Sequence, residues 1–172
     1  NGTLVTRQSV EINSEQRNHG SFRDPSGFVY SRDGLVYRHV NHTYRDAYDH
    51  LMLSGLYEHL VHADLLISHT EASADRALDG HPYKVLQPAA VPFWSYPYEW
   101  CFGQLKDAAL ATLEVQKRAI NFGMSLKDCS SYNIQFVHSR PVLIDTLSFE
   151  MYQEGMLWVA YRQFCQHFLA PL

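Results

Sequence analysis

The segment from 27 to 40, "GFVYSRDGLVYRHV", follows the two-residue period of β-strands. Phe28 and Tyr30 are large apolar residues at alternate positions, and a second alternating run extends over residues 35–40. The intervening Arg-Asp-Gly at 32–34 has the composition of a tight turn. The pattern predicts a β-hairpin.

A helical period follows over residues 43–62. Asn41 or Thr43 can cap the helix, and apolar residues then recur at spacings of three and four. These residues are Tyr48, Leu51, Met52, Leu56, Leu60 and Val61. We expect a single helix of about five turns, which Gly55 weakens only modestly.

Two further strands are indicated by "LLISHTEA" and "YKVLQPAAVPFWSYPYEW", which a polar loop at 73–82 separates. Prolines confine the second of these to a sheet edge or to a strand that leads into an extended crossing segment. They are Pro88, Pro92 and Pro97.

The strongest amphipathic pattern is "GQLKDAALATLEVQKRAINFG", a predicted helix that ends at Gly123, where a C-cap glycine belongs. "YNIQFV" and "PVLIDTL" then predict a short β-pair, and "GMLWVAYRQFCQHFL" predicts an amphipathic helix. This order of elements is that of an α+β protein, and we expect two lobes.

The domain organisation follows from these elements. We expect an N-terminal arm over residues 1–24, a β-rich lobe over 25–100, and a helical lobe over 101–172. The helical lobe includes a polar loop and β-pair at 124–150. Because the chain of 172 residues starts at an asparagine rather than a methionine, we expect it to be a piece of a longer protein.

The composition is that of a globular domain, with 46% hydrophobic and 19% charged residues. A net charge of −4 gives no general attraction to nucleic acid or to anionic membranes, so neither is expected as a partner. No apolar run approaches the roughly 18 residues that span a bilayer. Three cysteines without a C-x-x-C pair indicate free thiols, as in the cytoplasm.

A polar cluster lies in "MSLKDCSSYNIQFVHSRPVLIDTLSFE", residues 124–150. Asp128 and Asn133 form a D-x-x-x-x-N pattern, and Asp145 follows the second predicted strand of the β-pair. Such a pattern alone is weak evidence for a functional site, because residues that cap a tight connection would also produce it.

In its order of elements, with this cluster placed after the long helix, the chain resembles the protein-kinase-like fold, which aminoglycoside phosphotransferases share. The resemblance implies a small β-rich N-lobe with one helix and a truncated helical C-lobe. It implies that Asp128 is the base-like residue, and that Asn133 and Asp145 bind magnesium beside ATP. The segment "FWSYPYEW", which includes Tyr98, would be the hinge that binds adenine.

The chain also departs from that family. Arg38 stands where the phosphate-binding lysine is expected, and its acidic partner on the first helix would be Asp49 or Glu58. The hairpin has only two glycines, and Leu126-Lys127 replaces the His-Arg pair before the loop aspartate. A kinase-like fold without kinase activity is therefore one expectation.

Two stretches carry a closer resemblance: "SYPYEWCFGQLKDAALATLEVQKRAINFGMSLKDCSSYNIQF" and "RPVLIDTLSFEMYQEGMLWVAYRQFCQHFLAPL". They look like the N-terminal region of bacterial proteins described as class I SAM-dependent methyltransferases or as nodulation-protein-related. The resemblance covers most of residues 25–172. It implies that a C-terminal methyltransferase domain, in cis, binds SAM. These 172 residues contain no strand with a G-x-G-type loop and a following acidic residue, so no SAM-binding residue is expected among them.

Other chemistry has weaker support. The pairs His39/His42 and His59/His62 have helical spacing but lack further ligands for zinc, so we favour ordinary histidines. Cys129 has no positioned base and is interpreted as a bystander. The aromatic residues of the segment 93–100 either stack a ligand ring or pack between the lobes, and we favour packing.

Three functions remain open. The chain is a non-catalytic kinase-like module of a methyltransferase, which binds a small-molecule substrate or supports the partner domain. Alternatively, it is an active phosphotransferase that acts on a small hydroxylated molecule, or it is a structural interaction domain. The closeness of the second resemblance favours the first.

Overall fold

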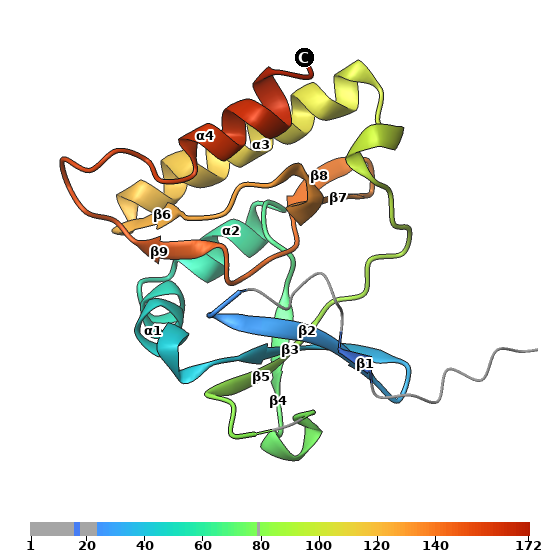
Figure 1. The fold of residues 1–172 in the computed structure, drawn as a ribbon, viewed down its shortest axis with the longest axis vertical. Helices are drawn as coiled ribbons and strands as arrows, with labels where there is room; N and C mark the ends of the chain where they lie inside the picture. The colour runs from blue at the N-terminus through green and yellow to red at the C-terminus, as the bar shows by residue number, and fades with distance from the viewer. Residues whose placement is uncertain (1–15, 18–23, 79) are drawn as a thin grey trace, which may run out of the picture.

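The computed structural model describes residues 16–17, 24–78 and 80–172. A five-stranded antiparallel sheet lies at one end of the molecule, and helices α3 and α4 with two small sheets lie at the other (Figure 1). The α+β class is therefore confirmed. The predicted N-terminal arm lies outside the described residues except for Gln16–Arg17 and Asp24.

The large sheet has the order β1-β2-β3-β5-β4, in which every neighbouring pair is antiparallel. Its strands are β1 (Gln16–Arg17), β2 (Gly27–Arg32), β3 (Leu35–Val40), β4 (His69–Ala72) and β5 (Lys84–Pro88).

Strands β2 and β3 form the predicted hairpin. Asp33 and Gly34 have φ angles of 53° and 73°, the left-handed conformation that a two-residue hairpin turn requires. At the other end of the hairpin, a Cβ added to Gly27 would lie 2.0 Å from the carbonyl oxygen of His39. Only a glycine therefore lets the two strands approach as closely as they do.

The prediction of one helix over 43–62 is wrong in one respect, because the helix is broken in two. A 3₁₀ turn (His42–Tyr44) leads into α1 (Arg45–Leu53), and α2 (Leu56–His62) follows after a break. Gly55 lies in the break with a φ of 84°. Its left-handed conformation ends the first helix and redirects the second, so that Leu51, Leu56 and Leu60 all become fully buried.

Helix α3 (Phe102–Asn121) confirms the strongest helix prediction. Its inner face includes Ala108, Ala109, Thr112, Val115 and Ala119, all buried. Gly123 follows the helix with a φ of 74°, as expected of a residue that ends it.

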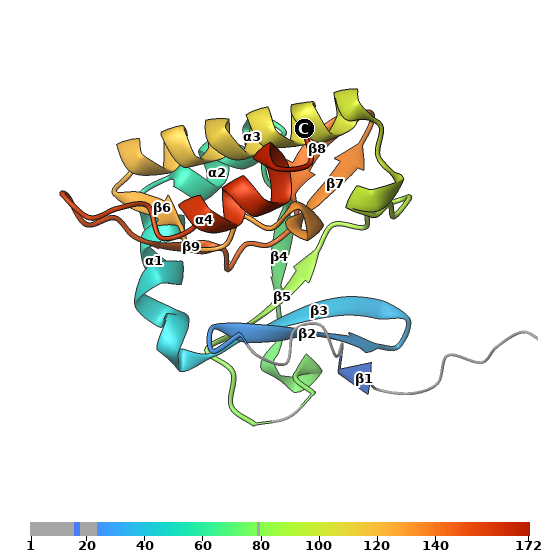
Figure 2. The same ribbon diagram turned by 45° about the horizontal axis from the view of Figure 1, so that its top comes forward.

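Two small antiparallel sheets lie against the helices. Strand β6 (Met124–Leu126) pairs with β9 (Phe149–Met151), and β7 (Ile134–Val137) pairs with β8 (Arg140–Leu143), which confirms the predicted β-pair. An isolated parallel bridge joins Leu66 to Leu143, which connects the segment entering β4 to this region (Figure 2).

The predicted C-terminal helix over 155–169 is only half formed. Helix α4 spans Tyr161–Phe164 and continues as a π-helical stretch, Cys165–Leu169. The residues before α4 are irregular, and within them the Trp158 indole N–H donates to the carbonyl of Leu126 at 2.8 Å. This contact ties the segment before α4 to β6.

The largest core lies between α2, α3, the small sheets and α4, and it includes Val115, Phe149, Phe164 and Phe168. A smaller core between α1 and the large sheet is built on Tyr44, Tyr48 and Leu147. No helix among the described residues is both long enough and apolar enough to cross a membrane.

Candidate functional site

The candidate site lies where strand β3 meets the loops that follow β6 and β8. Arg38 projects from β3 with a side chain only 10% exposed. Its Nη2 lies 2.8 Å from Oδ1 of Asp145 and 3.4 Å from Oδ2 of Asp24. One buried guanidinium therefore binds two carboxylates, of which Asp145 is the closer and the more buried.

Asp145 is held by its own turn as well as by Arg38. Its Oδ1 accepts a hydrogen bond from the backbone N–H of Leu147 at 2.8 Å, and its side chain is 13% exposed. Because the guanidinium of Arg38 lies against the same oxygen, this carboxylate already has a cation and a backbone donor in the folded chain.

Asp128 is directed toward helix α4. Its Oδ1 accepts hydrogen bonds from Nε2 of Gln163 at 2.8 Å and from the backbone N–H of Ser130 at 3.0 Å. The first bond links the loop to the C-terminal helix, and the second closes an Asx turn. The carboxylate thus has a structural role in holding the loop on α4.

Asn133 is anchored through its backbone. Its carbonyl accepts from the N–H of Ile144 at 2.8 Å, one residue before Asp145, and its N–H donates to Ser130 at 2.9 Å. Its side-chain Nδ2 is buried and makes no hydrogen bond within the described part of the chain. The main chain thus brings Asn133 close to the segment that carries Asp145.

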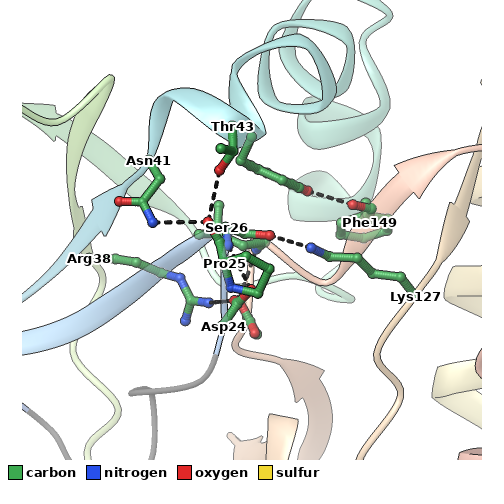
Figure 3. A network of polar contacts seen from close by, with 11 residues as sticks. Asp24, Pro25, Ser26, Arg38, Asn41, Thr43, Lys127 and Phe149 are labelled. Atoms are coloured by element: carbon green, nitrogen blue, oxygen red, sulfur yellow. Dashed lines mark hydrogen bonds and ion pairs between the residues drawn. The ribbon is translucent and has the colours of Figure 1, made fainter.

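Residues 24–26, which we call the strap, cross this region (Figure 3). The carbonyl of Pro25 accepts from Nδ2 of Asn41 at 2.9 Å and from Oγ1 of Thr43 at 2.8 Å. The carbonyl of Ser26 accepts from the N–H of Asn41 at 2.8 Å. These bonds fix the strap on the end of β3.

The strap also reaches the loop after β6. Nζ of Lys127 donates to the buried hydroxyl of Ser26 and lies 4.7 Å from the centre of the Tyr44 ring. The Tyr44 hydroxyl donates to the carbonyl of Phe149 at 2.8 Å. Burial, and then the nearby charge of Asp145, raise the pKa of Tyr44 far above its usual value, so this hydroxyl stays protonated.

The acids expected to pair with Arg38 lie elsewhere. Asp49 on α1 accepts from the Tyr83 hydroxyl and lies 3.6 Å from Arg45. Glu58 is exposed on α2. The carboxylates that bind Arg38 come instead from the strap and from the turn after β8.

The aromatic residues of 93–100 are mostly exposed, so the prediction that they pack between lobes is wrong for four of five. The exposed fractions are 76% for Phe93, 53% for Trp94, 48% for Tyr96 and 75% for Tyr98. Trp100 alone packs inward, edge-on to Phe136 at 5.2 Å between ring centres.

The remaining candidates are placed as follows. Within the described residues there is no group of three or more His, Cys, Asp or Glu side chains that could hold a metal ion. His39 stacks on Phe28 with ring centres 4.5 Å apart. Cys129 is buried, its thiol donates to the carbonyl of Ala160 at 3.2 Å, and burial raises its pKa to about 12. Such a thiol is protonated at neutral pH, as expected of a bystander.

Sequence reasoning missed the strap and Gln163. The Asp-Pro-Ser sequence at 24–26 is typical of a turn, which gives no indication that its side chains bind Arg38 and Lys127. Since Ser26 and Lys127 are 101 positions apart, no local pattern links them.

The comparisons with known proteins identify a bacterial relative of the chain. No model of a protein family matches the chain. The chain is 38% identical over 155 residues to Nodulation protein NoeA from Rhizobium meliloti (strain 1021). The match covers 89% of this chain but 32% of that protein, so the chain spans about a third of its relative's length. The expected kinship with nodulation-related bacterial proteins is thereby supported.

Proposed function

We propose that this chain is a non-catalytic, kinase-like module of a bacterial SAM-dependent methyltransferase, and that it supports the domain that binds SAM. The similarity to Nodulation protein NoeA supports the kinship, and about two thirds of that protein lies outside the matched region. In this proposal, the residues that bind SAM and transfer the methyl group belong to that other region.

The topology supports the kinase-like part of the proposal. A five-stranded antiparallel sheet with helices between β3 and β4 is followed by an extended crossing segment and a long helix. The pairs β6–β9 and β7–β8 then flank the loop that carries Asp128 and Asn133, and Asp145 follows β8. This is the order in which a kinase-like fold presents its catalytic loop and its second aspartate.

The observation that carries the non-catalytic part is the 2.8 Å ion pair between Arg38 and Asp145. Oδ1 of Asp145 lies 2.8 Å from a guanidinium nitrogen and accepts a hydrogen bond from a backbone N–H, so a magnesium ion at this oxygen would have to compete with a cation that is already in place. The carboxylate of Asp128 is likewise bonded to Gln163. The arrangement does not fit magnesium and ATP, and we derive no phosphoryl-transfer step from it.

The support for a partner domain comes from the apolar surface around residues 151–159. A cavity of about 410 Å³ opens there between α3, β6, β9 and the segment before α4. Gln116 and Ser125 form its polar floor, and Met156 and Leu157 line it with exposed fractions of 67% and 94%. Flexible methionines beside a fully exposed leucine are typical of a surface that another protein segment covers. In this proposal, the methyltransferase domain covers it in cis.

Leu157→Glu in the full-length protein tests this docking surface. A charge placed against an apolar interface should weaken domain association, lower SAM-dependent methyl transfer, and increase the susceptibility of the interdomain connection to proteolysis. Leu53→Glu is the matched control, because Leu53 is 87% exposed at the end of α1. Equal effects of the two substitutions would contradict the proposed docking.

One observation favours the second candidate, a phosphotransferase that acts on a small hydroxylated molecule. The backbone hydrogen bond from the N–H of Ile144 to the carbonyl of Asn133 brings Asn133 and Asp145, two residues with side-chain oxygens of the kind that magnesium binds, onto neighbouring segments. Binding of magnesium by Asn133 and Asp145 would then require Arg38 to move. Magnesium-dependent ATP turnover that Asp145→Ala abolishes would establish this function.

A further inference from the structure

Two exposed tyrosines form a parallel stack in the segment between β5 and α3. The rings of Tyr96 and Tyr98 have centres 5.4 Å apart and planes inclined by only 4°, the geometry of an offset stack. Tyr98 is 75% exposed, so most of its outer ring surface is open to solvent. The adjacent loop contributes Tyr132, which is 52% exposed.

This stack stands on a rigid backbone. The buried side chain of Gln135 accepts from the N–H of Ser95 at 3.0 Å and donates to the carbonyl of Ser95 at 3.0 Å. The Trp100 indole donates to the Ser95 hydroxyl at 2.9 Å, and Oε2 of Glu99 accepts from the N–H of Tyr96 at 2.7 Å. These bonds hold the backbone that carries the stack in place before any ligand arrives, which lowers the entropy cost of binding.

The surroundings of the stack carry little charge. No Lys, Arg or His occurs between Lys84 and Lys106, and the carboxylate of Glu99 is occupied by its backbone bond. Partial desolvation, with Glu99, Tyr96 and Tyr132 nearby, raises the pKa of Tyr98, so the phenol stays neutral. An anionic ligand would find no cation on this segment of the chain, whereas a neutral ligand would find aromatic faces and hydroxyl donors.

We propose that Tyr96 and Tyr98 form a binding site for a neutral carbohydrate. The apolar C–H face of a pyranose ring stacks on the open face of Tyr98, and its hydroxyl groups exchange hydrogen bonds with phenol hydroxyls. A nucleotide also stacks on aromatic rings, but its phosphates need cations that this segment lacks. The site rests on the geometry of residues 95–100 and is independent of the proposed role in a methyltransferase.

The test is calorimetric titration of the full-length protein with β-1,4-linked tetrasaccharides of glucose and of N-acetylglucosamine, at millimolar concentrations. We expect saturable binding of at least one of them. Tyr98→Ala should lower its affinity about tenfold, the scale of one lost stacking contact. Tyr161→Ala should leave it unchanged, because Tyr161 is a similarly exposed tyrosine, 60%, on α4. Circular dichroism confirms that each variant is folded.

Three results would overturn the inference. One is the absence of binding to either tetrasaccharide, and another is equal binding by the wild type and Tyr98→Ala. The third is protection of Tyr98 from hydroxyl-radical oxidation in the ligand-free full-length protein, which would show that another part of the protein covers the stack. Protection that appears only when the tetrasaccharide is added would support it.

Discussion

Replacing Arg38 with methionine removes the cation that binds Asp145 while preserving most of the side-chain volume. The two side chains are 10% and 13% exposed, so solvent screens their interaction little. Loss of one partner of a buried ion pair costs about 3–5 kcal/mol, because the other charge stays desolvated. Since Asp145 keeps the hydrogen bond from Leu147, we expect a loss of about 3 kcal/mol, at the lower end of that range.

The assay is urea unfolding at pH 7, followed by circular dichroism, of the two single variants and of the double variant Arg38→Met/Asp145→Asn. The double variant should lose less stability than the sum of the single losses, with a coupling of about 2 kcal/mol. Arg140→Met is the control, because the pair between Arg140 and Asp64 is 71% and 64% exposed. Its removal should cost about 0–1 kcal/mol. Additive losses, or a loss for Arg38→Met as small as that of the control, would refute the reasoning.

Two further predictions concern stability. Burial lowers the pKa of His69 to about 4, with Glu71 opposing, whereas an unfolded histidine takes up its proton near pH 6.5. The free energy of unfolding should therefore fall by roughly 2–3 kcal/mol as the pH is lowered from about 6.5 to 4. In urea titrations at several pH values, the free energy of unfolding of His69→Gln should change less with pH than that of the wild type. The same pH dependence in both proteins would contradict the lowered pKa of His69. Gly27→Ala places a methyl group against the His39 carbonyl at 2.0 Å, so the hairpin must distort. We expect a loss of about 2 kcal/mol or more in thermal or urea unfolding, and wild-type stability would contradict the close approach.

The local spacing of apolar residues was enough to predict those elements whose conformation depends mainly on residues near one another in the sequence. The hairpin formed because Asp33 and Gly34 adopt the left-handed turn that its alternation requires. Helix α3 formed because one small-residue face, which includes Ala108, Val115 and Ala119, packs along its length. In both cases, residues close together in the sequence are sufficient to predict the element.

Contacts between distant residues decided the features that were not predicted. Gly55 interrupts a helix whose apolar spacing was continuous, and Leu51, Leu56 and Leu60 on the two sides of the break are fully buried. The residues before α4 are irregular, and their Trp158 binds the Leu126 carbonyl, 32 positions away, a contact that no local pattern indicates.

In the candidate site, too, local spacing predicted some features, and contacts between distant residues decided the others. The spacing of Asp128, Asn133 and Asp145 pointed to one region, and the backbone hydrogen bond from Ile144 to Asn133 joins its two segments. The partner of Arg38 was not predicted, because the resemblance pointed to Asp49 or Glu58 on the first helix and gave no reason to consider the strap or the turn after β8. Only the folded chain placed Asp24 and Asp145 on the guanidinium.

The central claim is that Asp145 is committed to Arg38 and is not available to a metal–nucleotide complex. Calorimetric titration of the full-length protein with ATP in excess magnesium tests it most directly. We predict no saturable heat for the wild type. Saturable, magnesium-dependent binding that disappears in Asp145→Ala would contradict the claim.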